Sequence, residues 1–114
     1  MANTYKNASV SITSAGAAGS TTLYTVPSST TAIVNDIIIS NNSTGVDNTV
    51  NIIMRDNSAG ADFYIISGAQ APVNSNFAPL PGALVLEESD VIKTNIGTAD
   101  AAGVSIIASI LQIT

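Results

Sequence analysis

The chain has 114 residues and a formal net charge of −5, and it contains no cysteine, histidine or tryptophan. The missing thiols exclude a disulfide framework and a thiolate metal site, and only 3 basic residues argue against nucleic-acid binding, which relies on Lys and Arg. The charged fraction is 10%, below the roughly 25% of typical soluble domains, which fits either an ordinary acidic domain or a subunit of an assembly.

Val and Ile alternate with Ser, Thr and Asn along much of the chain, a pattern typical of β-strands. In the third such segment Ile37 and Ile39 share a face but Val34 falls on the other, so we expect a β-bulge near Asn35 and Asp36. The segment from Gly68 to Gly82 holds three of the four prolines and is predicted to be a crossing loop. In chain order, the alternation predicts strands at residues 6–13, 21–26, 31–41, 49–56, 62–67, 83–86, 91–96 and 104–113.

These segments predict an all-β fold: a single antiparallel β-sandwich, jelly-roll-like, with about eight short strands. We expect one domain over residues 1–114, with residues 1–5 as an N-terminal arm. No secretory signal is visible, and the most apolar stretch, Ala101–Ile113, is interrupted by polar residues and shorter than the roughly 20 residues of a membrane helix. We therefore expect no membrane partner.

The side chains that carry most enzyme chemistry are missing. Without His or Cys, Ser–His and Cys–His pairs are impossible, and a Ser–Lys pair would have to use Lys6 or Lys93, neither of which lies in a motif. Glu87 and Asp90 could form a glycosidase-like pair, but with Glu88 they are interpreted as a solvated turn. We expect a protein that is not an enzyme and has no cofactor.

Two further segments leave alternatives open. Residues 56–62 space oxygen atoms as hard-cation loops do, but the glycine is out of register with the EF-hand pattern, so a hairpin turn is favoured over a calcium site. Neighbouring Phe63 and Tyr64 point to opposite faces of a strand, which predicts one core ring and one exposed ring; Tyr64, if exposed, could bind a ligand or a second subunit.

Several apolar residues fall on faces opposite to the expected core. Ile38 and Ile53 do so, and the closing strand carries a second apolar row. Either that strand is central and covered on both sides, or its outer face meets another subunit. On the second interpretation we expect a homo-oligomer held by side-chain contacts, with Ile53, Tyr64, Ile107, Leu111 and Ile113 as the candidate subunit or partner contacts.

Two segments carry a family resemblance. The first is Thr22-Leu23-Tyr24-Thr25-Val26-Pro27, followed after a Ser/Thr turn by Ala32-Ile33-Val34 and a strand that ends in Ser40-Asn41-Asn42-Ser43. The second is Leu84-Val85-Leu86-Glu87-Glu88-Ser89-Asp90-Val91-Ile92. Together with the closing strand they resemble small virion structural proteins of tailed bacteriophages, including those of marine cyanobacterial phages. The family pattern often has Gly before the Asp of the second segment, where this chain has Ser89.

The resemblance covers the chain from about Thr21 onward and implies a compact β-sandwich located in the virion. It implies a capsid decoration (cement) protein whose partner is the major capsid protein, or else a neck, tail or fibre component. A trimer is the first expectation, because trimeric clusters suit the local symmetry axes of capsids. The alternative from another class is a jelly-roll carbohydrate-binding module.

Overall fold

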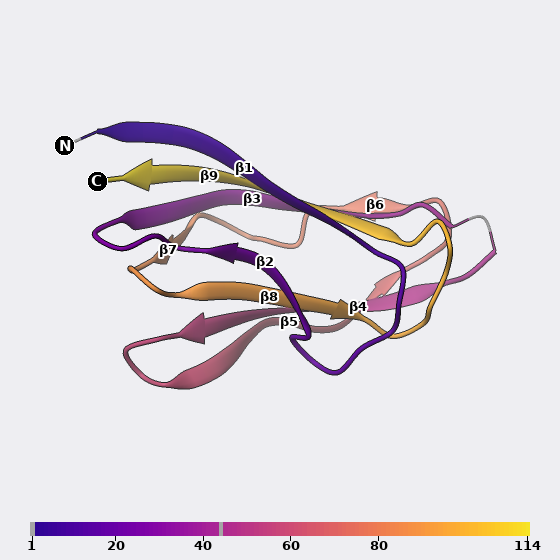
Figure 1. The fold of residues 1–114 in the computed structure, drawn as a ribbon. Coiled ribbons are helices and arrows are strands. Elements are labelled where there is room, and N and C mark those ends of the chain that lie inside the picture. The colour runs from indigo at the N-terminus through magenta and orange to yellow at the C-terminus, as the bar shows by residue number, and fades with distance from the viewer. Residues whose placement is uncertain (1, 44) are drawn as a thin grey trace.

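The computed structural model describes residues 2–43 and 45–114, and every regular element in them is a β-strand (Figure 1). These residues contain no helix long and apolar enough to cross a membrane. The strands are β1 (Asn3–Ile12), β2 (Thr21–Thr25), β3 (Thr31–Asn41), β4 (Asn48–Asp56), β5 (Ala61–Ala71), β6 (Asn76–Phe77), β7 (Leu84–Leu86), β8 (Val91–Ile96) and β9 (Val104–Ile113).

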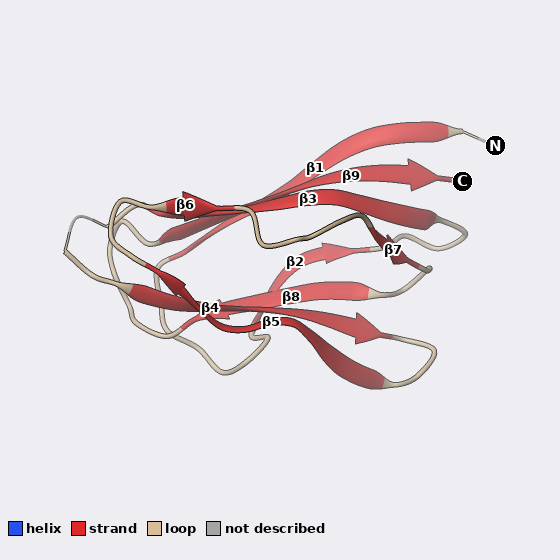
Figure 2. Ribbon diagram, turned by 180° about the vertical axis from the view of Figure 1, so that it is seen from behind, coloured by secondary structure: helices blue, strands red, loops and turns tan. Residues whose placement is uncertain are grey.

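The strands form two antiparallel sheets that pack face to face, as Figure 2 shows from behind. One sheet has the order β1-β9-β3, with β6 and β7 both paired to the far side of β3; the other has the order β2-β8-β4-β5. Because β6 and β7 follow one another along the same edge of β3, they act as one interrupted strand. The result is two four-stranded layers in the order of a jelly roll, which confirms the predicted all-β sandwich.

The register of β3 confirms the predicted bulge. The pairing of β3 with β9 shifts between Val34 and Asp36, so that Val34, Ile37 and Ile39 all point into the core. The extra residue corrects the phase of the alternation within a single strand. The closing strand β9 lies between β1 and β3 and is therefore central in its sheet.

The core between the sheets is almost entirely aliphatic. Ile39 and Ile106 come from one sheet and Ile52 and Ile92 from the other, and each is fully buried. Burying one such side chain stabilises the fold by roughly 1.5–3 kcal/mol. The one aromatic ring in the buried cluster is Tyr24, whose hydroxyl oxygen accepts a hydrogen bond from Nε2 of Gln112 at 2.6 Å across the two sheets.

Two segments differ from the sequence prediction by more than one or two residues. Residues 3–5 do not form an arm, because β1 pairs with β9 from Asn3 opposite Ile113 onward; Met1 lies outside the described residues. This part of β1 is exposed to solvent, so its residues are mostly polar and show no apolar alternation that would predict a strand. The predicted crossing loop is also shorter, because β5 continues to Ala71 and β6 adds a short pair with β3.

Buried asparagines anchor the loops to the sheets. Oδ1 of Asn48 accepts hydrogen bonds from the backbone N–H groups of Gly97 and Thr98, at 3.1 Å each. Asn95 accepts from the N–H of Gly19 and donates to the carbonyl of Gly16, which ties the β1–β2 loop to β8. Among the described residues, no buried side-chain nitrogen or oxygen lacks a partner. Side-chain amides thus hold these two loops in place.

The acidic segment 87–90 is not simply a solvated turn, contrary to the sequence prediction. Asp90 is buried, with a relative exposure of 4%, and its two carboxylate oxygens accept from the N–H of Asn57 and the N–H of Glu87, both at 2.9 Å. Its carbonyl accepts from the N–H of Val26 at 2.9 Å. One residue therefore connects three turns at the same end of the sandwich, and only Glu87 and Glu88 match the solvated interpretation.

Ser89 occupies a backbone conformation that favours glycine, with φ of 69°. Replacing Ser89 with glycine should raise the free energy of unfolding by about 0.5–1 kcal/mol, because relief of the left-handed strain outweighs the greater freedom of glycine in the unfolded chain. Equilibrium urea denaturation measures the change. As a control, Ser14→Gly in an exposed loop without positive φ should be neutral or slightly destabilising; equal stabilisation by both variants would contradict the assignment.

Candidate interaction surface

The outer face of the β1-β9-β3-β7 layer carries a continuous line of apolar side chains. Tyr5 of β1 is opposite Leu111 of β9, Leu111 is opposite Ile33 of β3, and Ile33 is opposite Val85 of β7. We call these four residues the outer apolar row. Tyr5 is 82% exposed and Val85 60%, while the two central residues are partly covered by their neighbours. The row crosses the full width of the layer.

A second apolar pair lies further along the same face. Ile38 and Ile107 are opposite each other on β3 and β9, and they are 41% and 43% exposed. Between this pair and the outer apolar row lies Asp36, opposite Ser109 at the bulge, with its carboxylate turned back to the N–H of Ile37 at 2.9 Å. The remaining outward positions of β1 and β9 are mainly Ser and Asn. This face therefore offers apolar contact area with little charge to desolvate.

The outer face of the β2-β8-β4-β5 layer differs because it carries two basic side chains, Arg55 and Lys93. Asp62 accepts from Nζ of Lys93 at 3.1 Å and from Arg55 at 3.4 Å. The hydrogen bond from Lys93 is the main reason that the pKa of Asp62 lies below its usual value. This face therefore carries a fixed cluster of charges, Arg55, Asp62 and Lys93, which the first face does not have.

Ile53 lies on that second face but is not available to a partner. It is 2% exposed, because the β1–β2 loop packs over it: a Cβ placed on Gly19 would lie 3.4 Å from Cδ1 of Ile53. The prediction of Ile53 as a contact residue is therefore wrong. The alternation correctly indicates its face, but it carries no information about a loop that folds back from a distant part of the chain.

The other predicted contact residues divide between the two faces. Ile107, Leu111 and Ile113 lie together on the outer face of β9, with Ile107 the most exposed of the three. Tyr64 is 53% exposed, but on the other layer, opposite Ile53. The prediction of one core ring and one exposed ring at 63 and 64 is wrong, since Phe63 is 51% exposed at the edge strand.

Sequence reasoning does not identify Tyr5, Ile33 or Val85 as members of this surface. For Tyr5 a signal is present, because extending the alternation of the first strand back to Asn3 places Tyr5 on the outward face with Asn7 and Ser9. For Ile33 and Val85 the signal is absent, since their exposure depends on which strands are neighbours.

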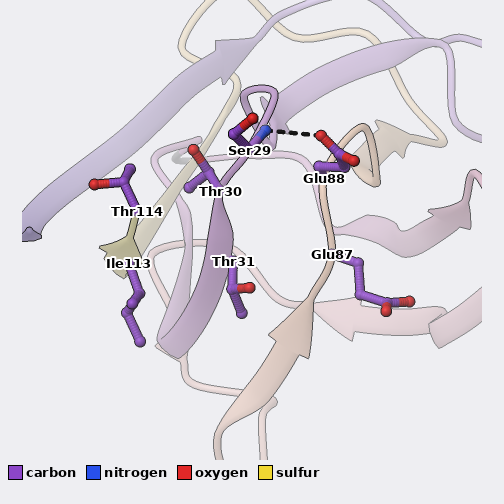
Figure 3. A pocket seen from close by; sticks show the side chains of 7 residues that line it. All are labelled: Ser29, Thr30, Thr31, Glu87, Glu88, Ile113 and Thr114. Atoms are coloured by element: carbon purple, nitrogen blue, oxygen red, sulfur yellow. Dashed lines mark hydrogen bonds between the residues drawn. The ribbon is translucent and has the colours of Figure 1, made fainter. Parts of the chain in front are cut away.

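An open groove of about 420 Å³ lies at the end of the sandwich near the C-terminus (Figure 3). Glu88 reaches across it to accept from the N–H of Ser29 at 2.7 Å, while Glu87 points away from that contact. Asp90 is buried, and both of its carboxylate oxygens accept backbone hydrogen bonds within the turns, whereas the side chain of Glu87 is exposed. The groove is lined by Ser29, Thr30, Thr31, Glu87, Glu88, Ile113 and Thr114.

The segment considered for calcium is a hairpin turn between β4 and β5. Oδ1 of Asp56 accepts from the hydroxyl of Ser58 at 2.9 Å and the N–H of Ala59 at 3.2 Å, and Gly60 closes the turn onto the Asp56 carbonyl. The bonds to the carboxylate lower the pKa of Asp56, the Ser58 side-chain bond most of all. In residues 2–43 and 45–114 no group of three or more His, Cys, Asp or Glu side chains is placed to hold a metal ion.

No protein-family model matches this sequence, and a search of curated proteins finds no significant match. The outer face of the β1-β9-β3-β7 layer is therefore interpreted from its own geometry.

Proposed function

We propose that this protein is a non-enzymatic structural protein of a tailed-phage virion, most simply a capsid decoration protein that attaches to the major capsid protein. The observation that carries the proposal is the outer apolar row, Tyr5, Leu111, Ile33 and Val85, on strands whose outward side chains include one acid, Asp36. Contiguous exposed apolar surface on a small soluble domain marks an interaction site. The phage setting comes from the resemblance of residues 22–43 and 84–92, and the function is consistent with the jelly-roll fold.

The size of this face is adequate for stable docking. Four strands at roughly 4.8 Å spacing and ten residues at roughly 3.3 Å each give a layer of about 600 Å². A standard protein interface buries about 800 Å² on each partner, so this face and its rim together approach that size. A neck, tail or fibre position would use the same surface with a different partner.

A carbohydrate-binding module is the second candidate, since lectins also use the jelly roll. The distribution of aromatic rings argues against it. Sugar-binding faces stack several rings on the ligand, whereas this face presents Tyr5 as its one aromatic side chain. Tyr64 and Phe63 lie on the other layer.

The test is binding to particles that lack the protein. We expect the double variant Tyr5→Ser, Val85→Glu to bind such particles at least 10-fold more weakly, because it removes the two most exposed apolar side chains and adds a charge. The matched control is Tyr64→Ser, which removes a similarly exposed ring from the other layer and should bind normally. Quantitative sedimentation with capsids measures both.

Two results would contradict the proposal. Equal binding by the double variant and the wild type would exclude this face as the docking surface. Mass spectrometry of purified virions that does not detect the chain would exclude the virion assignment, and saturable binding on a glycan array would then favour the carbohydrate-binding module.

A further inference from the structure

The free edge of β1 differs from every other sheet edge in the described residues. All ten residues of β1 pair with β9 without a register shift, and nothing pairs with the opposite side of β1. A long, regular edge presents a row of unpaired N–H and C=O groups that can pair with another strand. Both ribbon views show the N-terminal half of β1 lying well away from β2 (Figures 1 and 2).

The other edges carry features that oppose strand pairing. β2 has only five residues and a register shift between Thr22 and Tyr24. The pairing of β5 with β4 shifts twice, around Ile52, and β5 contains Gly68 at φ 65°. β6 and β7 have two and three residues, and the segment between them contains two prolines. Bulges, short strands and prolines are among the usual protections of sheet edges, and β1 has none of these three; its one charged side chain is Lys6.

The hydrogen-bonding phase of β1 follows from its first pair. Ala2 and Thr114 exchange both backbone hydrogen bonds, at 3.2 and 2.9 Å. In an antiparallel ladder such pairs alternate, so the even-numbered residues of β1 bond to β9. The N–H and C=O groups that point outward are those of Asn3, Tyr5, Asn7, Ser9 and Ser11.

We propose that the β1 edge binds the β1 edge of a second copy of this chain, antiparallel about a two-fold axis that passes through Asn7. In this register Tyr5 lies opposite Ser9 of the second copy and Asn3 lies opposite Ser11, so all five outward-facing residues exchange hydrogen bonds. Shifting the axis to Ala8 places Asn3 opposite Thr13, beyond the end of the strand, and shifting it to Lys6 places Ser11 opposite Met1, outside the described residues. An axis at Lys6 also places two lysines directly opposite each other, which is destabilising.

This contact closes on itself. Each copy has one regular edge, and a two-fold pairing consumes both, so the assembly stops at a dimer. Runaway pairing through open sheet edges is prevented by the protected edges of β2, β5, β6 and β7. The pairing gives a dimer, whereas a trimer would require another contact. It does not depend on the proposed function, and it leaves the outer apolar row of both copies on one continuous layer.

The absence of cysteine from the chain makes cross-linking a clean test. Under oxidising conditions Asn7→Cys should form a covalent dimer, because residues in a hydrogen-bonded antiparallel pair have Cα atoms about 5.5 Å apart, within the Cα range of disulfides. Asn3→Cys and Ser11→Cys should each remain uncross-linked alone, since identical positions are then roughly 27 Å apart. A mixture of these two variants should cross-link.

A second variant tests the edge without cysteine. Asn7→Pro removes an N–H that points away from β9, so the fold should persist, while the dimer dissociation constant measured by light scattering should rise at least 100-fold. Far-ultraviolet circular dichroism confirms the retained fold.

A wild-type protein that stays monomeric at millimolar concentration, or cross-linking of Asn3→Cys alone, would overturn the proposal. The proposal would also be overturned if the wild type were monomeric and Asn7→Pro weakened only its binding to particles. The β1 edge would then pair with another protein and not with a second copy of this chain.

Discussion

Replacing Asp90 with alanine should lower the free energy of unfolding by about 2–4 kcal/mol, although the residue lies in an acidic turn that looks like ordinary surface. The carboxylate is buried and accepts from the N–H groups of Asn57 and Glu87 at 2.9 Å each. Hydrogen bonds to a charged group contribute more than neutral ones, and their loss leaves two backbone donors without partners. Urea denaturation followed by circular dichroism measures the effect.

The neighbouring acids provide matched controls for Asp90. Glu87→Ala changes an exposed side chain in the same turn and should shift stability by less than about 0.5 kcal/mol. Asp90→Asn should cause an intermediate loss of stability. Its amide oxygen can still accept one of the two hydrogen bonds, whereas its amide nitrogen is a donor and cannot accept the other. Equal effects of Glu87→Ala and Asp90→Ala would show that the turn does not depend on the buried carboxylate.

Replacing Gly103 with alanine should be about as severe, with a loss of about 3–5 kcal/mol of stability. Gly103 has φ of 69°, which disfavours any residue with a Cβ, and a Cβ there would collide with the backbone oxygen of Ile12. A backbone oxygen cannot move aside as a side chain can. The start of β9 would have to separate from the end of β1, which disturbs the central strand of its sheet.

Two other glycines separate the two causes of this loss. Gly60 has φ of 65° with open space around it, so Gly60→Ala should cost about 1–2 kcal/mol through backbone strain alone. Gly82 has neither positive φ nor close neighbours, and Gly82→Ala should change stability little. If Gly103→Ala were no worse than Gly60→Ala, the close approach of Ile12 would not determine the cost.

The candidate surface shows how far the sequence can lead. The two apolar faces of β9 are visible as alternation in residues 104–113, so the sequence alone identifies Ile107, Leu111 and Ile113. It misses Tyr5 because the predicted strand begins three residues too late, at Lys6 instead of Asn3. It misses Val85 because a strand of three residues carries too little alternation to show which face meets solvent.

Local patterns in this chain determined the fold class, the centres of its strands and the bulge after Val34, because period-two alternation and turn residues are read from neighbours along the chain. Only the tertiary structure decided which apolar residues remain exposed. Ile53 and Ile107 have the same sequence signal, yet one is covered by the β1–β2 loop and the other lies 43% exposed. Asp90 and Glu87 likewise share a turn but differ in burial. The physical reason is that burial is set by contacts between segments far apart in the sequence, and alternation within one strand carries no information about them.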